Sequence, residues 1–305
     1  MQTILITGGT GLIGHSLSKH LLQTGYRVII LTRNPEKQTA MPGISYAKWD
    51  LKKQWIDPNA ISAADHIIHL AGAGVIDKKW TAAYKKEIID SRTKSSELII
   101  ETLKRHLNKV KTIVSASAIG WYGEDKEGGN AFVETDPPDT AFLGETCRLW
   151  EQSIQPVTEL GERLVILRTG IVLSADGGAF KEFKRPLNFG VAAMMGSGDQ
   201  MMSWLHVDDL CNMYTYALEN ENMNGSYNAV APHPVTNKEL TLTLARSANK
   251  IFIPVHVPSF ILKMMLGQRS IELLKSATVS SKKIEDTGFS FKYPEIMKAI
   301  EDLLK

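Results

Sequence analysis

Short apolar runs alternate with stretches of helical spacing through the first half of the chain. Runs rich in β-branched residues predict strands over residues 3–7, 26–31, 44–49, 65–70, 111–115 and 163–168. Apolar residues three or four positions apart predict helices over residues 12–22 and 142–160, and a longer helical stretch over 80–107 that we expect to be broken or kinked. Such alternation is typical of an α/β fold, in which helices cover both faces of a parallel sheet.

The pattern becomes irregular after Gly170. The segment from Gly190 to Ser203 is rich in glycine and methionine and predicts a loop. The tail from Val257 to Lys305 predicts two or three short helices. We therefore expect a first domain over residues 1–230 and a second lobe over residues 231–305, with residues 171–205 contributing partly to that lobe.

The composition restricts the partners that the chain can have. Of its 305 residues 43% are hydrophobic, Lys and Arg number 35 against 33 for Asp and Glu, and no block of like charge reaches five residues. This balance gives no electrostatic reason to expect a nucleic-acid or membrane partner. No apolar run approaches the roughly 18 residues of a membrane span, and the first residues do not read as a signal peptide, so we expect a cytoplasmic protein.

The cysteines and histidines point away from metal and disulfide chemistry. The two cysteines, Cys147 and Cys211, are far apart and form no CxxC pair. The eight histidines are scattered without the spacing of paired ligands. We therefore expect no metal site and no disulfide framework.

The strongest local motif is TGGTGLIG, which runs from Thr7 to Gly14. It follows a predicted strand and opens a predicted helix, which is the context that a dinucleotide-binding loop requires. Gly8 would allow the tight turn, Gly11 the approach of a pyrophosphate, and Gly14 the packing of helix on sheet. The helix N-terminus adds free N–H groups and the positive end of a dipole. We therefore expect a dinucleotide here rather than a glycine-rich turn without a ligand.

The end of the second predicted strand distinguishes between the two nicotinamide cofactors. An acidic residue at this place would bind the ribose hydroxyls and repel a 2′-phosphate. This chain has Thr32, Arg33 and Asn34 there, with Lys37 close behind. Arg33 can bind a phosphate through its guanidinium fork, although a solvated surface arginine is the alternative. We expect NADP(H), with NAD(H) as the weaker candidate.

Several motifs give the chain a family resemblance. TGGTGLIG, HLAG from His69 and WLHVDD from Trp204 resemble the extended short-chain dehydrogenase/reductases. More narrowly, SASAIGWYG from Ser115, GSGDQMMSWLHVDD from Gly196 and GFSFKYP from Gly288 are similar to an atypical subgroup labelled epimerase family proteins, with a C-terminal domain of unknown function. The resemblance covers nearly the whole chain. It implies a Rossmann-type, doubly wound parallel sheet with a small, mostly helical C-terminal substrate lobe.

The resemblance also implies which residues contact the cofactor. They would come from the glycine loop, the ends of the second and fourth strands, the following helix and the loop after Arg168. These residues are Gly8, Thr10, Gly11, Leu12, Ile13, Thr32, Arg33, Leu70, Ala71, Gly72, Glu87, Arg92 and Val172, with Ile171 as the alternative to Val172. Glu87 and Arg92 are five positions apart, which is not the spacing of neighbours on a helix, and surface ion pairs are the alternative for both.

The catalytic residues of the wider family are only partly present. That family uses a Ser, and a Tyr whose pKa is lowered by a Lys four residues later. Ser117 matches the serine, just past the fifth predicted strand. Tyr122 and Lys126 have the formal spacing of the pair, but they lie among glycines and charges without helical periodicity. The working pair of the extended family lies further along, where this chain has Leu143 and Cys147, so the usual catalytic acid is missing.

Three residues remain candidates for the chemistry. Tyr122 could swing toward the substrate, with its phenol pKa lowered by Arg92, which stands where the extended family usually has an Asn. Cys147 could be a thiol near the nicotinamide, although a buried structural cysteine is the commoner case. Ser117 could hydrogen-bond the substrate or the cofactor.

Other residues are candidates for the substrate pocket or for structure. The candidates for the pocket walls are Trp121, Gln200 and Trp204, although a tryptophan at such a place is as often part of the core. His206 suggests acid–base chemistry, but we expect its segment to be structural, with Asp208 or Asp209 capping a helix.

Two functions fit these residues. The first is an NADP(H)-dependent oxidoreductase or epimerase acting on a small or nucleotide-linked carbonyl substrate, which the cofactor motifs and Ser117 favour. The second is a non-catalytic NADP(H)-binding sensor or regulatory protein, which the missing Tyr–Lys pair favours. A third, partner binding without a cofactor, leaves the glycine loop and Arg33 unexplained. A small-molecule substrate is the expected partner; a homodimer is compatible with the resemblance, but no motif identifies its face.

Overall fold

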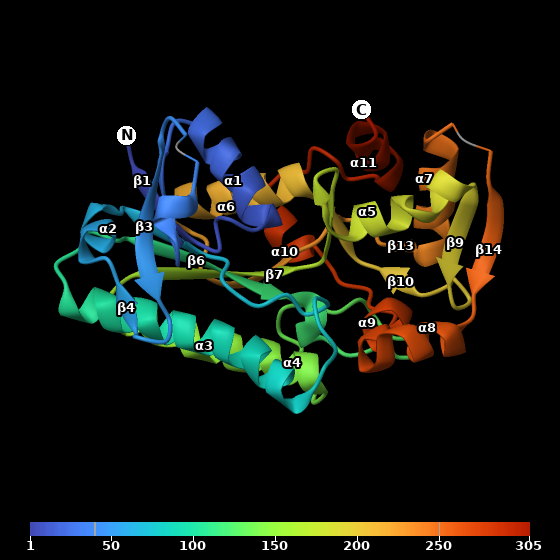
Figure 1. The fold of residues 1–305 in the computed structure, drawn as a ribbon, viewed down its shortest axis with the longest axis horizontal. Coiled ribbons are helices and arrows are strands. Elements are labelled where there is room, and N and C mark those ends of the chain that lie inside the picture. Colours follow the sequence, from blue (N-terminus) through green and yellow to red (C-terminus); the bar gives the residue numbers. More distant parts are fainter. Residues whose placement is uncertain (40, 250) are drawn as a thin grey trace.

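An eight-stranded sheet forms the centre of the computed structural model, which describes residues 1–39, 41–249 and 251–305 (Figure 1). Its strands are β1 (Thr3–Thr7), β2 (Arg27–Thr32), β3 (Ile44–Asp50), β4 (Trp55–Ile56), β5 (His66–His69), β6 (Thr112–Ala118), β7 (Arg163–Thr169) and β12 (Gly225–Ala229). They lie in the order β12-β7-β6-β5-β1-β2-β3-β4, and neighbours are parallel except for β3 and β4. Since β1 lies between β2 and β5, the winding reverses there, and a ligand crevice is expected at the carboxyl ends of these strands.

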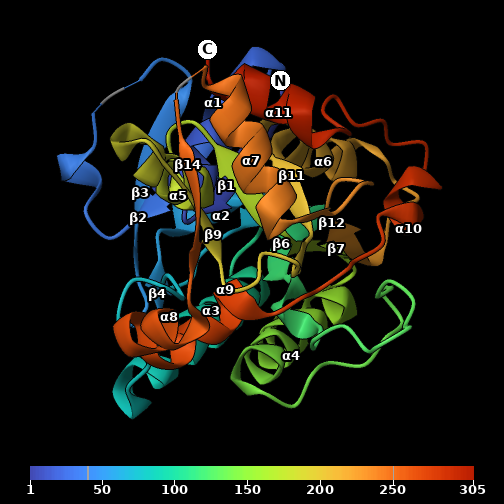
Figure 2. The ribbon, with the colours of Figure 1, turned by 90° about the vertical axis from the view of Figure 1, so that its right-hand side faces the viewer.

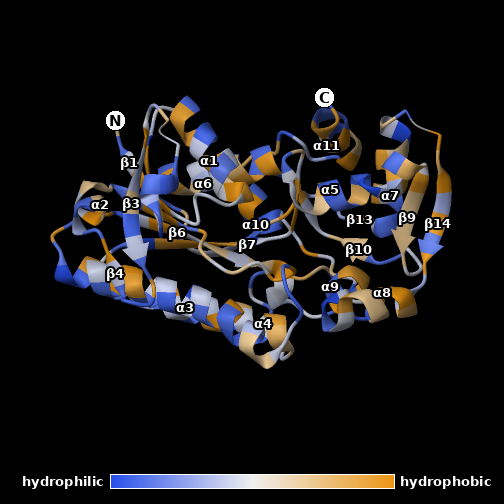
Figure 3. Ribbon diagram, in the orientation of Figure 1, coloured by the Kyte–Doolittle hydropathy of each residue, from blue (hydrophilic) through white to orange (hydrophobic). Residues whose placement is uncertain are grey.

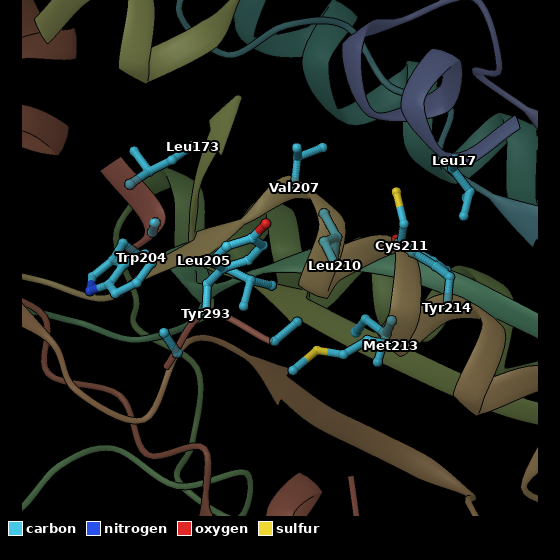
Figure 4. Packing of buried hydrophobic residues seen from close by; sticks show 14 of the residues in the cluster. Leu17, Leu173, Trp204, Leu205, Val207, Leu210, Cys211, Met213, Tyr214 and Tyr293 are labelled. Carbon is cyan, nitrogen blue, oxygen red and sulfur yellow. The ribbon is translucent and has the colours of Figure 1, made fainter. Parts of the chain in front are cut away.

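Helices cover both faces of this sheet because successive side chains of each strand point to opposite faces. In β1, Ile4 and Ile6 belong to one hydrophobic cluster and Leu5 to the other, and all three are fully buried. The helices are α1 (Leu12–Gln23) and α6 (Val207–Glu219) on the first face, and α2 (Pro58–Ala63), α3 (Ala82–Arg105) and α4 (Phe142–Ile154) on the second. Figure 4 shows Leu17 of α1 beside Cys211 of α6. The expected doubly wound α/β fold is confirmed, and each of the six predicted strands is present with ends shifted by at most three residues.

The remaining elements form a smaller lobe beyond the carboxyl ends of the strands (Figures 1 and 2). Its strands pair two by two: β8 (Ile171–Ser174) with β11 (Trp204–His206), β9 (Val191–Met195) with β14 (Ile253–Val257), and β10 (Met201–Met202) with β13 (Val235–Thr236). Its helices are α5 (Gly178–Lys184), α7 (Asn237–Ser247), α8 (Ser259–Leu266), α9 (Ile271–Leu274), α10 (Lys282–Glu285) and α11 (Ile296–Leu303). Short 3₁₀ helices are η1 (Pro35–Lys37), η2 (Ile119–Trp121), η3 (Gln155–Leu160), η4 (Pro186–Phe189) and η5 (Gly267–Ser270). The tail is thus helical, as expected, and α8 is hydrophobic over most of its length (Figure 3).

The long helical stretch is not broken. α3 runs without interruption over 24 residues, because it contains neither glycine nor proline. Its central Ser and Thr side chains donate to carbonyls one turn earlier, as Thr93 does to Ile89 O at 3.2 Å and Ser95 does to Arg92 O at 2.8 Å. The expectation of a kink was therefore wrong. Neither α3 nor any other helix in the described part of the chain is long and apolar enough to cross a membrane.

The segment from Gly190 to Ser203 is not simply a loop. It contains β9 and β10, and β9 is paired along its length with β14, from Val191 opposite Ile253 to Met195 opposite Val257. The two strands are about sixty residues apart in sequence. Local composition cannot reveal such a pairing, because the hydrogen-bond partners are supplied by a distant segment.

His206, rather than an aspartate, caps α6. Its Nδ1 accepts a 3.1 Å hydrogen bond from Asp208 N. Asp209 instead accepts hydrogen bonds from Lys292 N and Tyr293 N at 2.7 and 2.9 Å, and so attaches the tail to α6. The expected structural role of this segment is found, but with different partners. No group of three His, Cys, Asp or Glu side chains among the described residues is placed to hold a metal ion.

Candidate cofactor-binding and reaction site

The loop between β1 and α1 leaves room for an anion at the start of the helix. Gly8 has a φ of 70°, and a Cβ atom there would lie 2.9 Å from the carbonyl carbon of Leu70. A Cβ on Gly14 would lie 2.4 Å from Gly8 O, so helix and loop meet through bare backbone. A Cβ on Gly11 would approach only Gly8 O, at 3.4 Å, among the described atoms, and no side chain caps α1. The first N–H groups of α1 are therefore open to a pyrophosphate, as a dinucleotide requires.

Thr7 and His69 tie this loop to β5 and α3. Thr7 Oγ1 accepts hydrogen bonds from Leu70 N and Ala71 N, each at 3.2 Å, and lies 2.7 Å from His69 Nδ1. Because the single Thr7 proton must go to Nδ1, we assign the His69 ring proton to Nε2. Nε2 lies 3.2 Å from the hydroxyl of Ser95 on α3. Burial lowers the pKa of His69 to about 3, so the ring is neutral.

The end of β2 presents an unpaired cation. Thr32 is buried, and its hydroxyl accepts a 3.4 Å hydrogen bond from Asn34 N. Arg33 is exposed and forms no ion pair with any residue that the structure describes. Glu36 and Lys37 follow in η1. Arg33 is therefore free to bind a phosphate at this edge of the crevice.

The turn before α5 forms a second wall of the crevice, beside the glycine loop. A Cβ on Gly178 would lie 3.0 Å from Leu12 Cδ2, so this turn packs closely on the loop. A cavity of about 600 Å³ runs along α5, and its charged lining residues are Asp176, Lys181, Glu182, Lys184 and Arg185. Val172, a predicted cofactor contact, is half-buried in β8 and opposite Leu205 of β11.

Ser117 is held by a buried ion pair. Its hydroxyl donates a 2.7 Å hydrogen bond to Oε1 of Glu151 on α4. Glu151 also accepts from Arg168 of β7, with Nε at 2.8 Å from Oε1 and Nη2 at 2.9 Å from Oε2. All three side chains are buried, and the two-point contact compensates the burial of both charges. Since the Ser117 proton is donated to Glu151, the hydroxyl can only accept from a ligand in this arrangement.

Tyr122 lies at the other end of the same network. Its hydroxyl donates a 2.7 Å hydrogen bond to Asn228 Oδ1 and accepts one from Arg168 Nη1 at 3.1 Å. The side chain is fully buried, and burial raises its pKa to about 12 despite the opposing charge of Arg168. The expectation that Arg92 lowers this pKa was wrong, because Arg168 is the neighbouring arginine and burial outweighs it. The Tyr122–Lys126 spacing falls in irregular backbone rather than on a helix.

The positions of the missing Tyr–Lys pair line the end of β6. A Cβ on Gly120 would lie 3.4 Å from Leu143 Cβ and 3.6 Å from Cys147 Sγ. Cys147 is buried, and burial raises the pKa of its thiol to about 11, followed by the nearby Glu151 charge. The thiol is therefore protonated at neutral pH, and these two positions carry neither a phenol nor an ammonium group.

Glu87 and Arg92 lie in different surroundings on α3. Glu87 is exposed and forms a 3.5 Å ion pair with Lys78 at the surface. Arg92 is buried beside Gly72, where a Cβ would lie 2.9 Å from the guanidinium carbon. Arg92 therefore reaches the end of β5, as Leu70, Ala71 and Gly72 do, whereas Glu87 points elsewhere.

The candidate pocket residues are separated by the fold. Trp121 stacks on Arg168, with its ring centroid 3.7 Å from the guanidinium carbon, and remains partly exposed at the end of β6. Gln200 donates to Met195 O at 3.0 Å, and so bridges backbone segments of the lobe. Trp204 is completely buried in the lobe core (Figure 4). Of the three, Trp121 lies nearest to the network of Ser117.

Sequence reasoning missed Glu151, Arg168 and Asn228 as members of the site. A charged residue within the apolar strand RLVILRT was an available signal for Arg168, since a buried charge needs a partner. Glu151 served only as an alignment point. No local pattern marks Asn228, which is 106 residues from Tyr122.

A doubly wound sheet with an uncapped glycine loop at its switch point defines a dinucleotide-binding protein of the Rossmann type. The sequence model of the NAD dependent epimerase/dehydratase family matches residues 4–230, and that of a domain of unknown function, DUF1731, matches residues 257–303. The chain belongs to the NAD dependent epimerase/dehydratase family, which confirms the family resemblance.

Relatives and solved structures agree with this assignment. Epimerase family proteins of Staphylococcus saprophyticus and Staphylococcus aureus are 37% and 35% identical, and each match covers 100% of both chains. The human epimerase family protein SDR39U1, solved with NADPH, is 26% identical with a TM-score of 0.85 and 99% of both chains covered. A UDP-glucose 4-epimerase of Thermotoga maritima, solved with UDP-glucose, shares the fold at 18% identity, with a TM-score of 0.80 and coverage of 99% and 97%.

Proposed function

We propose that the protein binds NADP(H) and acts as an oxidoreductase or epimerase on the carbonyl group of a small or nucleotide-linked substrate. The observation that carries the proposal is the uncapped glycine loop at the switch point, with the unpaired Arg33 at the neighbouring strand end. The NADPH of the human relative supports the choice of cofactor. NADP(H), when bound, supplies or takes up a hydride at its nicotinamide.

Each part of the crevice has a separate task in this proposal. The backbone from Gly8 to Ile13 binds the pyrophosphate, and Thr32 and Arg33 bind the 2′-phosphate end. Leu70, Ala71, Gly72 and Val172 contact the cofactor from the ends of β5 and β8. Ser117 and Trp121 lie at the end of β6, where the substrate meets the nicotinamide. We also propose a division of the chain near residue 230 into a cofactor domain and a substrate lobe.

A fluorescence titration with NADPH and NADH at one fixed salt concentration tests the cofactor. The wild type should prefer NADPH, and Arg33→Asp should weaken NADPH binding by at least about tenfold, since a charge-assisted phosphate contact is lost and repulsion is added. Arg27→Asp is the matched control, because Arg27 is exposed at the opposite end of the same strand. Failure to bind either nucleotide, or an unchanged preference in Arg33→Asp, would contradict the proposal.

A non-catalytic NADP(H) sensor is the second candidate, and one observation favours it. The hydroxyls of Ser117 and Tyr122 are both used within a buried network, and Leu143 and Cys147 replace the usual pair. NADPH oxidation with a panel of carbonyl compounds separates the candidates. Turnover that Ser117→Ala abolishes, in a variant that still binds NADPH, would exclude the sensor; absence of turnover with every carbonyl tested favours it.

A further inference from the structure

Arg92 is a buried cation that no carboxylate neutralises. Its side chain is only 9% exposed, and its Nη1 donates to Ile88 O at 2.9 Å and to Ala73 O at 3.0 Å. No Asp or Glu of the described chain forms an ion pair with it, whereas the other deeply buried arginine, Arg168, is paired with Glu151. An unpaired buried charge reduces stability. We therefore looked for a negative group that Arg92 could bind.

The guanidinium is held in one orientation by its surroundings. The guanidinium carbon lies 4.8 Å from the ring centroid of Trp150, and only the absence of a side chain at Gly72 lets it lie against the backbone there. Both protons of Nη1 are used by carbonyls, so the remaining donors are on Nε and Nη2. That edge of a guanidinium is suited to a carboxylate, which it binds through two parallel hydrogen bonds.

Arg92 also stands beside the reaction centre. The charge of Arg92 acts on Cys147, the residue at the place of the missing lysine, and Cys147 lies against Gly120 at the end of β6. The thiol carries no charge at neutral pH, so α3 rather than α4 supplies the positive charge here. The cofactor phosphates have other partners in the proposed function, namely the glycine loop and Arg33. Arg92 is thus left for a further anion.

We propose that Arg92 binds a carboxylate of the substrate, which places the substrate among carbonyl compounds that carry a carboxylate near the reactive carbon. This inference rests on the proposed function and names the substrate class of the same site. The bidentate contact fixes the substrate relative to the end of β6. Gly72 and Trp150 act as positioning residues that hold the plane of the guanidinium.

Formate is the probe, because it is the smallest carboxylate. Thermal unfolding is followed while potassium formate replaces potassium chloride at constant ionic strength, with and without saturating NADPH. A ligand that binds only the folded state raises the Tm in a saturable way. Formate should therefore raise the Tm of the wild type in both series, and Arg92→Gln should weaken its apparent affinity at least about tenfold.

Two further variants make the result specific. Arg105→Gln removes an exposed arginine from the end of the same helix and should respond to formate as the wild type does. Arg92→Lys keeps the charge but not the fork, and should bind formate several-fold more weakly than the wild type. If Arg92→Gln does not fold, the comparison of Arg92→Lys with Arg105→Gln still decides.

The outcomes are distinguishable from failure of the proposed function. No formate response in the wild type, or equal responses in all variants, overturns the inference. A response that vanishes once NADPH is bound assigns Arg92 to a cofactor phosphate and also overturns it. Absence of any Tm increase on adding NADPH contradicts the proposed function instead, and is read separately from the series with formate alone.

Discussion

The hydroxyl of Ser117 donates a 2.7 Å hydrogen bond to Oε1 of Glu151, two residues that are 34 positions apart in the chain. Through Glu151 the serine is joined to Arg168, and through Arg168 to Tyr122. The polar side chains at the end of β6 therefore behave as one buried network. A role of any member in turnover is coupled to the stability of the whole.

Glu151→Gln should lower the free energy of unfolding by about 3–5 kcal/mol, because it leaves the buried Arg168 without its counter-charge. Urea unfolding measures the change. Glu101→Gln is the control, since Glu101 pairs with Arg105 at the surface of α3 with its side chain 46% exposed, and it should cost less than about 1 kcal/mol. Equal losses in the two variants would show that the buried pair contributes no more than a surface pair.

Gly11→Ala and Gly14→Ala should separate binding from stability. At Gly11 a methyl group approaches only Gly8 O, at 3.4 Å, so the fold should tolerate it, whereas the methyl group occupies the space of the pyrophosphate. NADPH binding should weaken at least about tenfold with a nearly unchanged Tm. At Gly14 the methyl group would lie 2.4 Å from Gly8 O, so the Tm should fall as well. Unchanged NADPH affinity in Gly11→Ala would argue against a cofactor at this loop.

His69 should make the protein less stable in mild acid. Its folded pKa is about 3, below the ordinary value of 6.5, so between these values the unfolded chain binds a proton that the folded chain does not. Stability is therefore fully present above about pH 6.5 and is lost as the pH falls, by about 1.4 kcal/mol per pH unit from this one group. Urea unfolding at several pH values should show a shallower slope in His69→Gln. A His69 ring that titrates near pH 6 in the NMR spectrum of the folded protein would contradict the prediction.

Both cysteines should be unreactive in the folded protein. Burial raises the thiol pKa of Cys147 to about 11 and that of Cys211 to about 12, and the thiolate is the reactive form. A thiol reagent at pH 8 should modify neither residue until a denaturant is added, after which both should react. Cys147→Ser and Cys211→Ser identify which thiol reacts. Rapid native labelling that disappears in Cys147→Ser would reopen a thiol role at the reaction centre.

Much of the first domain could be predicted from sequence because its signals are local. The β-branched run at Thr3–Thr7 and the glycines that follow it act within one turn of the chain, and they appear as predicted. The kink expected in residues 80–107 was wrong because local hydrogen bonds satisfy the polar side chains of α3 without interrupting it. The pairing of β9 with β14 could not be predicted, because its partners come from distant segments.

The sequence by itself determined the order of strands and helices, the glycine loop, the cation at the end of β2 and the absence of the Tyr–Lys pair from its usual place. Only the tertiary structure decided that Tyr122 is buried against Arg168, that Glu151 holds Ser117, and that Arg92 remains without a counter-charge. The physical reason is that a local motif depends on neighbouring residues, whereas the charge state and hydrogen bonds of a buried side chain depend on which distant groups surround it.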